Sequence, residues 1–118
     1  MRVEPITFQA GVNLLDDSGK TLVDTIAQLL SNNYPNYRVA VRGHTGKGDE
    51  AANKQLSLER AESVTQYLKV VHGIDGDRLH SEGCGSTKPP LRNAGESTRA
   101  YNYRLPRVEF VLLEANNL

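Results

Sequence analysis

The chain has 118 residues and a mass of 13.0 kDa, which fits one domain and leaves no room for two ordinary ones. Its 14 Lys and Arg residues balance 14 Asp and Glu residues, so the formal net charge is zero. That balance excludes the basic surface of a non-specific nucleic-acid binder and argues against attachment to an anionic membrane surface. The single cysteine, Cys84, excludes an intramolecular disulfide and a cysteine-based zinc site.

No segment approaches the ~20 apolar residues that a membrane span needs, so the domain itself is not expected to be membrane-embedded. Residues 1–8 lack the apolar region of a signal peptide and run directly into a strand-like segment. The chain is therefore either a cytoplasmic protein or one domain of a longer protein, and the abrupt start favours the domain.

The first two expected elements are a short strand and a helix. Residues 3–8 are typical of a strand, and Pro5 suits the edge of a sheet or the start of a strand. Asp17 or Ser18 could cap the helix that follows, and residues 32–35, with two asparagines and a proline, would end it. Apolar residues recur there at helical spacing, and they are Leu22, Ile26, Leu29 and Leu30.

A second strand and a second helix follow. Residues 37–42 alternate between apolar and other side chains, which predicts a strand with one apolar face. Residues 43–48 form a polar loop with three glycines, Asp49 can cap the next helix, and Gly73 would stop it. The apolar stripe of this helix consists of Leu56, Ala61, Val64, Leu68 and Val71.

The remaining elements are two strands separated by a long loop. Residues 78–82 predict a strand after a turn at 75–77, and residues 83–95 are loop-like, with Gly, Pro, Ser and Asn. Residues 107–113 alternate as a final strand, and residues 115–118 are expected to be a frayed tail.

The expected order of elements is β-α-β-α-β-β. Two strand–helix–strand units imply right-handed crossovers between parallel strands, and the last strand can insert antiparallel. The predicted fold class is therefore α+β, a two-layer sandwich in which helices cover one face of a mixed sheet. Residues 1–114 would form this single domain.

The most informative stretch for function is 42–61, RGHTGKGDEAANKQLSLERA. A glycine-rich loop leaves the end of a central strand and leads into a helix, which is where ligands bind in open α/β sheets. Loop amides at a helix N-terminus attract anions, and Arg60 could pair with a carboxylate through two parallel hydrogen bonds. The alternative is that Arg60 is a solvated helix residue.

The same stretch resembles a known family. Residues 43–45, GHT, then Asn53 and residues 56–61, LSLERA, match the pattern GHTD…NxxLSxxRA of OmpA-like peptidoglycan-binding domains, which include the Pal lipoprotein and the MotB stator protein. The resemblance extends over nearly the whole chain. It implies a β-α-β-α-β-β domain of the bacterial periplasm that binds the stem peptide of peptidoglycan non-covalently, usually through diaminopimelate. It further implies that Arg60 pairs with the ligand carboxylate and that the ring of His44 hydrogen-bonds to the loop backbone.

The chain departs from that pattern where the family pairs the ligand ammonium. Gly46 stands in place of the motif Asp, and the loop is one residue shorter. Asp49 could supply the missing carboxylate, although its role as a helix cap is the favoured interpretation. Leu105 and Pro106 look inserted before the last strand, which leaves open whether Arg104 or Arg107 corresponds to the family's first Arg. The candidate ligand-binding residues are His44, Thr45, Gly46, Asp49, Asn53, Leu56, Arg60, Arg104 and Arg107.

The hypothesis from sequence is a binding module of the periplasm or cell envelope that anchors a larger, membrane-attached protein to peptidoglycan. The alternative is a domain that has lost its ligand and serves as a protein–protein module, and a homodimer is one option for its assembly. No enzyme is expected, because a triad of Ser57, His44 and Asp49 would place the nucleophile inside a helix. No cofactor or metal site is expected either, because the histidines lack paired ligands.

Overall fold

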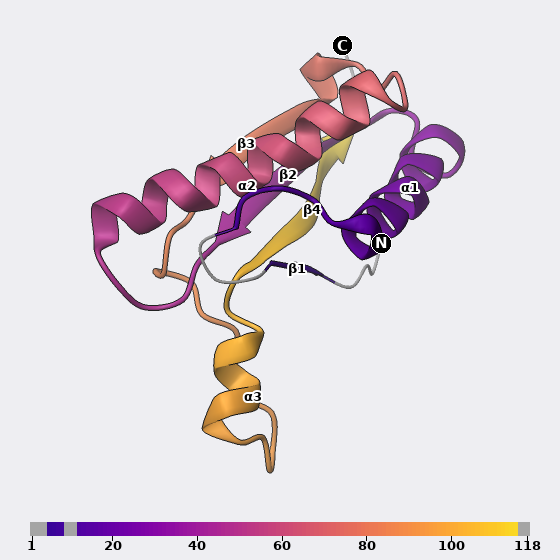
Figure 1. The fold of residues 1–118 in the computed structure, drawn as a ribbon. Helices are drawn as coiled ribbons and strands as arrows, with labels where there is room; N and C mark the ends of the chain where they lie inside the picture. Colours follow the sequence, from indigo (N-terminus) through magenta and orange to yellow (C-terminus); the bar gives the residue numbers. More distant parts are fainter. Residues whose placement is uncertain (1–4, 9–11, 116–118) are drawn as a thin grey trace.

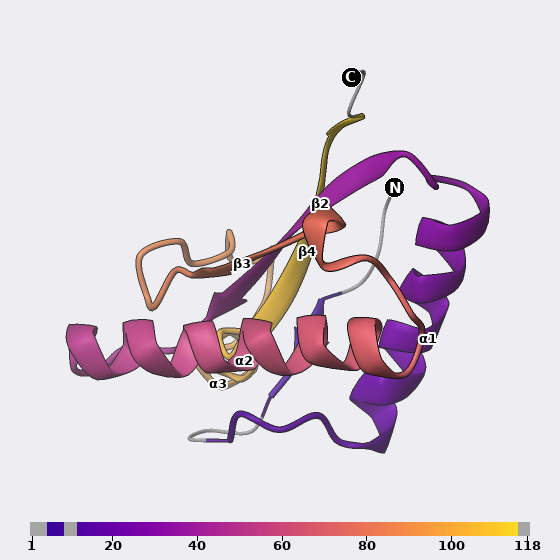
Figure 2. The same cartoon turned by 90° about the horizontal axis from the view of Figure 1, so that it is seen from above.

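The computed structural model describes residues 5–8 and 12–115, and over these it has a four-stranded mixed sheet with its long helices on one face (Figure 1). Figure 2 shows both long helices on the same side of the strands. This confirms the predicted two-layer α+β architecture. The elements in order are β1 (Ile6–Thr7), α1 (Asp17–Asn32), β2 (Tyr37–His44), α2 (Glu50–Val70), the 3-10 turn η1 (Gly76–Arg78), β3 (Leu79–Gly83), α3 (Thr98–Tyr103) and β4 (Arg107–Ala115).

The last strand is inserted in the middle of the sheet, whose order is β1-β4-β2-β3. β2 pairs in parallel with β3, whereas β4 is antiparallel to both β1 and β2. The expected antiparallel insertion is thus confirmed, and β1 is an edge strand next to Pro5, as predicted. β1 is short, and residues 3 and 4 of the expected strand lie outside the described residues.

The first helix begins one residue earlier than predicted. Its N-cap is Asp16, whose carboxylate accepts a hydrogen bond from the amide of Gly19 at 2.7 Å, rather than Asp17 or Ser18. The buried face is also rotated from the predicted stripe. Its members are Gly19, Val23, Ile26, Ala27 and Leu30, because Val23 and Ala27 face the sheet while Leu22 and Leu29 lie at the rim.

The second strand is longer than predicted and is covered on both faces along its middle. Gly43 and His44 belong to β2 and not to the loop, because they pair with Gly83 and Arg107 on the neighbouring strands. Ala40 is buried like Val39, so the predicted alternation does not hold in this central strand.

Glycine on β2 lets helix α2 approach the sheet closely. A Cβ atom added at Gly43 would lie 1.8 Å from the backbone oxygen of Ser57, and one at Gly83 would lie 2.7 Å from that of Lys54. These two glycines are partners in the β2–β3 register. The helix backbone therefore rests directly on two adjacent strands, and this contact sets the position of the side chains that α2 presents beyond the end of β2.

The segment before the last strand contains a helix that the sequence pattern did not predict. α3 is capped by Ser97, whose hydroxyl accepts a hydrogen bond from the amide of Ala100, and it projects from the end of the sheet (Figure 1). Six residues are too few to show a helical period, which explains the omission. β4 continues to Ala115, the first residue of the expected frayed tail, and residues 116–118 lie outside the described residues.

The hydrophobic core lies between the helices and the sheet. Its buried members are Ile6, Phe8, Val23, Ile26, Ala27, Leu30, Val39, Val41, Ala61, Val64, Leu68, Ile74 and Val108. Among the described helices, none has both the length and the hydropathy to cross a membrane.

Candidate functional site

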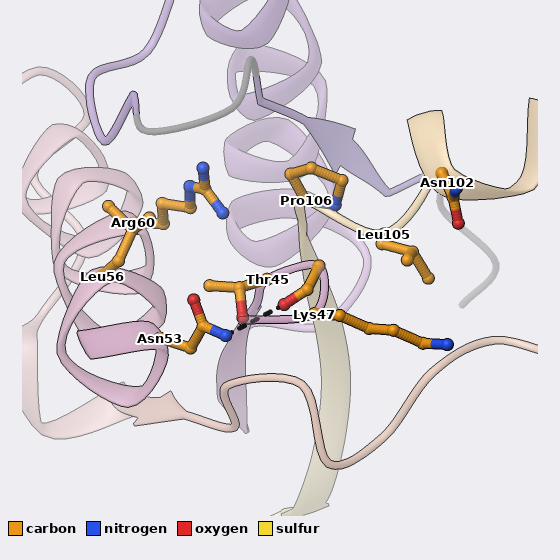
Figure 3. Close-up of a pocket in the computed structure, with 9 residues that line it drawn as sticks. Thr45, Lys47, Asn53, Leu56, Arg60, Asn102, Leu105 and Pro106 are labelled. Carbon is orange, nitrogen blue, oxygen red and sulfur yellow. Dashed lines mark hydrogen bonds between the residues drawn. The ribbon is translucent and has the colours of Figure 1, made fainter. Parts of the chain in front are cut away.

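A pocket of about 380 Å³ opens beyond the end of β2. Figure 3 shows it between the first half of α2, the loop that precedes this helix, and the connection from α3 to β4. Its volume lies at the small end of the range for ligand sites, ~300–1,000 Å³. The lining residues are Thr45, Gly46, Lys47, Asn53, Leu56, Arg60, Asn102, Leu105 and Pro106.

Arg60 brings a buried positive charge to this pocket. The residue is only 1% exposed, and its guanidinium points into the space between α2 and the α3–β4 connection (Figure 3). Nε donates to the carbonyl of Val12 at 2.8 Å and Nη1 to the carbonyl of His44 at 3.0 Å. Burial lowers the pKa of Arg60, but a guanidinium stays protonated in proteins. These two contacts fix the orientation of the guanidinium.

Thr45 adds a hydroxyl group that lacks a hydrogen-bond partner within the described residues. The residue is 5% exposed, and its amide donates to the carbonyl of Gly85 at 2.9 Å. That amide is therefore not available to a ligand, contrary to the expected cradle of loop amides. A buried hydroxyl without a partner costs roughly 1–3 kcal/mol of stability, and a ligand that bonded to it would remove this cost.

Asn53 and Ser57 hold the loop and the helix in place. The side-chain amide of Asn53 donates a hydrogen bond to the backbone carbonyl of Gly46 at 3.1 Å, drawn as a dashed line in Figure 3. The Ser57 hydroxyl donates to the carbonyl of Lys54 at 2.8 Å and accepts from the amide of Gly85 at 2.9 Å. The two Ser57 bonds occupy the hydroxyl that a catalytic triad would need.

Asp49 lies outside the pocket lining. Its carboxylate accepts from the amide of Ala52 at 2.9 Å and so forms the N-cap of α2. The lining residues within the described chain include no carboxylate, and their charged members are Arg60 and Lys47. The pocket is therefore cationic.

His44 contributes its backbone and not its ring. Side chains alternate along a strand, so the His44 ring faces away from α2, on the opposite side of the sheet from Thr45. There Nε2 lies 2.6 Å from Oε1 of Glu109, but neither ring nitrogen has a hydrogen bond within the described residues. The expectation that the ring bonds to the loop backbone is wrong. Burial and the charge of Arg107 lower the pKa of His44 to about 4, against the opposing effect of Glu109.

Arg104 and Arg107 both lie away from the pocket. Arg104 makes two 2.7 Å bonds to the carboxylate of Glu96, which holds α3 against the preceding loop and lowers the pKa of Glu96 to about 2. Arg107 is buried on the open face of the sheet, where it donates to the carbonyl of Lys88 at 2.8 Å. Neither arginine lines the pocket that contains Arg60.

Four lining residues were not among the predicted site residues: Lys47, Asn102, Leu105 and Pro106. For Leu105 and Pro106, the available sequence signal was their apparent insertion before the last strand. These two residues lie in the wall opposite Arg60 (Figure 3). Within the described residues, no group of His, Cys, Asp and Glu side chains could hold a metal ion.

Solved structures share this fold, and curated proteins are similar to this chain in sequence. The C-terminal domain of Helicobacter pylori MotB superposes with a TM-score of 0.81 at 23% identity, covering 98% of this chain and 88% of that one. Outer membrane porin F of Pseudomonas aeruginosa is 36% identical over 87 residues, which is 73% of this chain and 23% of the porin. The peptidoglycan-binding protein ArfA of Mycobacterium tuberculosis is 40% identical over 72 residues, 60% of this chain and 22% of ArfA.

The chain thus spans less than a quarter of these two curated relatives. The model of the OmpA family matches residues 7–103, which include both walls of the pocket up to Asn102. The chain belongs to the OmpA family.

Proposed function

We propose that this domain binds peptidoglycan non-covalently by holding a carboxylate of the stem peptide, that of diaminopimelate, against Arg60. The observation that carries the proposal is the buried guanidinium of Arg60 at the wall of an open pocket. A relative named as peptidoglycan-binding, ArfA, supports the ligand class. The protein would act in the periplasm as the cell-wall anchor of a larger, membrane-attached chain.

The strength of such a contact follows from its surroundings. A hydrogen bond to a charged group contributes roughly 1.5–3 kcal/mol, and a bidentate pair between guanidinium and carboxylate lies at the upper end. The partners at Val12 and His44 already orient the guanidinium, so little rotamer entropy remains to be lost when a ligand binds. Thr45 lies beside it and offers a hydroxyl as a second donor.

Titration with a stem tripeptide that ends in diaminopimelate, followed through backbone amide shifts, tests the proposal. We expect shifts at residues 43–60 and at Leu105, and at least a tenfold weaker affinity in Arg60→Lys, which keeps the charge and loses the planar fork. Arg38→Lys, at an exposed position on β2, is the matched control and should bind like the parent. The proposal is wrong if millimolar tripeptide shifts none of these amides, or if Arg60→Lys binds like the parent while its circular dichroism is unchanged.

A second candidate function is a protein–protein module that has no peptidoglycan ligand. It is favoured by an apolar surface between α1 and α2, where Leu14 is 71% exposed, Val70 70% and Val71 56%. Co-sedimentation with purified sacculi separates the two functions. The anchor is carried down by sacculi and is released by the tripeptide, whereas the protein–protein module stays in the supernatant.

A further inference from the structure

We infer that the pocket selects a stem-peptide carboxylate whose neighbouring amine is acylated, as in a cross-linked stem, over one whose neighbouring amine is a free ammonium. The inference rests on the proposed function and adds the chemical form of its ligand. It depends on the charges of the pocket and on the chemistry of the wall opposite Arg60.

The first observation is the imbalance of charge in the lining. Arg60 and Lys47 are both cationic, and no carboxylate lines the pocket within the described residues. The nearest acidic candidate in the sequence, Asp49, already accepts a hydrogen bond from Ala52 as a helix cap. A free ammonium that entered with the carboxylate would find no carboxylate in the described lining and would lie near the like charge of Arg60.

The second observation is that Leu105 and Pro106 form an apolar part of the wall facing Arg60. Leu105 is 5% exposed, and Pro106 continues the wall (Figure 3). An ammonium placed against these side chains would lose its hydration without compensation, which is costly, whereas an amide or acyl group is neutral and loses far less. Asn102, on the same wall, offers an amide that could hydrogen-bond to an acylated nitrogen or to its carbonyl.

The third observation makes the inference testable by a single substitution. A Cβ atom at Gly46 would lie 3.9 Å from Cβ and Cδ1 of Leu105, which is ordinary van der Waals contact, and Gly46 does not have a positive φ. An aspartate therefore fits at this position without backbone strain. It would place a carboxylate on the wall where the parent protein has none.

The experiment compares three tripeptides by calorimetric titration. The first is the unmodified diaminopimelate tripeptide, the second has its side-chain amine acetylated, and the third has its side-chain carboxylate amidated. We expect the protein to bind the acetylated peptide at least about threefold more tightly than the free amine. Amidation should weaken binding at least tenfold, because Arg60 loses its partner. Gly46→Asp should reverse the preference by raising affinity for the free amine about tenfold.

Gly46→Asn is the matched control, because it has nearly the same shape as Asp without the charge. It should not raise the affinity for the free amine as Gly46→Asp does. If the parent protein binds the free amine more tightly than the acetylated peptide, the inferred selectivity is overturned and the proposed function stands. If the parent binds neither peptide at millimolar concentration, the proposed function is overturned and the selectivity falls with it.

Discussion

At the scale of single residues, we expect the hydroxyl of Thr45 to have opposite effects on folding and on the proposed binding. It is buried beside Arg60 and has no partner within the described residues, so it destabilises the free protein. Thr45→Val keeps the branched shape and removes the hydroxyl, and we expect it to raise the free energy of unfolding by about 1 kcal/mol. The same variant should bind the stem tripeptide several-fold more weakly. Urea unfolding and titration measure the two effects, and a loss of stability would contradict the assignment of Thr45 to the ligand.

His44 makes the protein sensitive to mild acid. Burial lowers its pKa from 6.5 to about 4, so between these pH values the unfolded chain takes up a proton that the folded chain does not. The free energy of unfolding should therefore fall as pH drops from 6.5 to 4, by up to about 3 kcal/mol from this residue, and His44 should add no further loss below pH 4.

His44→Gln isolates this effect, because the variant is neutral at every pH. Urea unfolding at pH 7 and pH 4 should give a smaller difference for His44→Gln than for the parent protein. Equal differences in the two proteins would show that other groups cause the acid sensitivity.

At the scale of the elements, the contact between α2 and the sheet depends on Gly43. Gly43→Ala would place its new methyl group 1.8 Å from the backbone oxygen of Ser57, so α2 must move away from β2. We expect a loss of about 3 kcal/mol in the free energy of unfolding, measured in urea. Gly46→Ala is the matched control, because its methyl group would have ordinary contacts, and it should change stability by less than about 1 kcal/mol. Similar losses in both variants would contradict the close-packing argument.

The two roles considered for Asp49 differ in their consequences. Asp49 is the N-cap of α2, so Asp49→Ala should lower the free energy of unfolding of the protein by about 1 kcal/mol. Asp16→Ala, at the N-cap of α1, should lower it by a similar amount. Because Asp49 does not line the pocket, Asp49→Ala should leave tripeptide affinity within about twofold of the parent value. A tenfold loss of affinity in this variant, but not in Asp16→Ala, would identify Asp49 as part of the ligand site.

Sequence patterns predicted the long elements well and the local details poorly. α2 was predicted from its cap at Asp49 and its apolar period, both of which act within a few residues along the chain. Gly43 and His44 belong to β2 because they pair with residues of neighbouring strands, and the local sequence pattern carries no information on that pairing. Arg60 was predicted as a ligand residue from its motif, but its contacts with Val12 and His44 depend on packing.

At the scale of the whole molecule, the balanced charge affects how binding responds to salt. The net charge is zero, and the proposed ligand contact involves a buried guanidinium rather than an exposed basic surface. Retention on purified sacculi should therefore weaken by less than about threefold as salt rises from about 0.05 to 0.3 M, because buried pairs are poorly screened. A tenfold loss, measured by co-sedimentation, would indicate attachment through surface charge instead.

The insertion of β4 between β1 and β2 has a consequence for when the site comes into existence. One wall of the pocket comes from residues 45–60 and the other from residues 102–106, which β4 holds in place. A nascent chain in which β4 has not yet paired has one wall of the pocket and lacks the other. A ligand of this pocket can therefore be held only after β4 has been made and has paired with its neighbours, and a bound ligand would in turn stabilise β4 in the sheet.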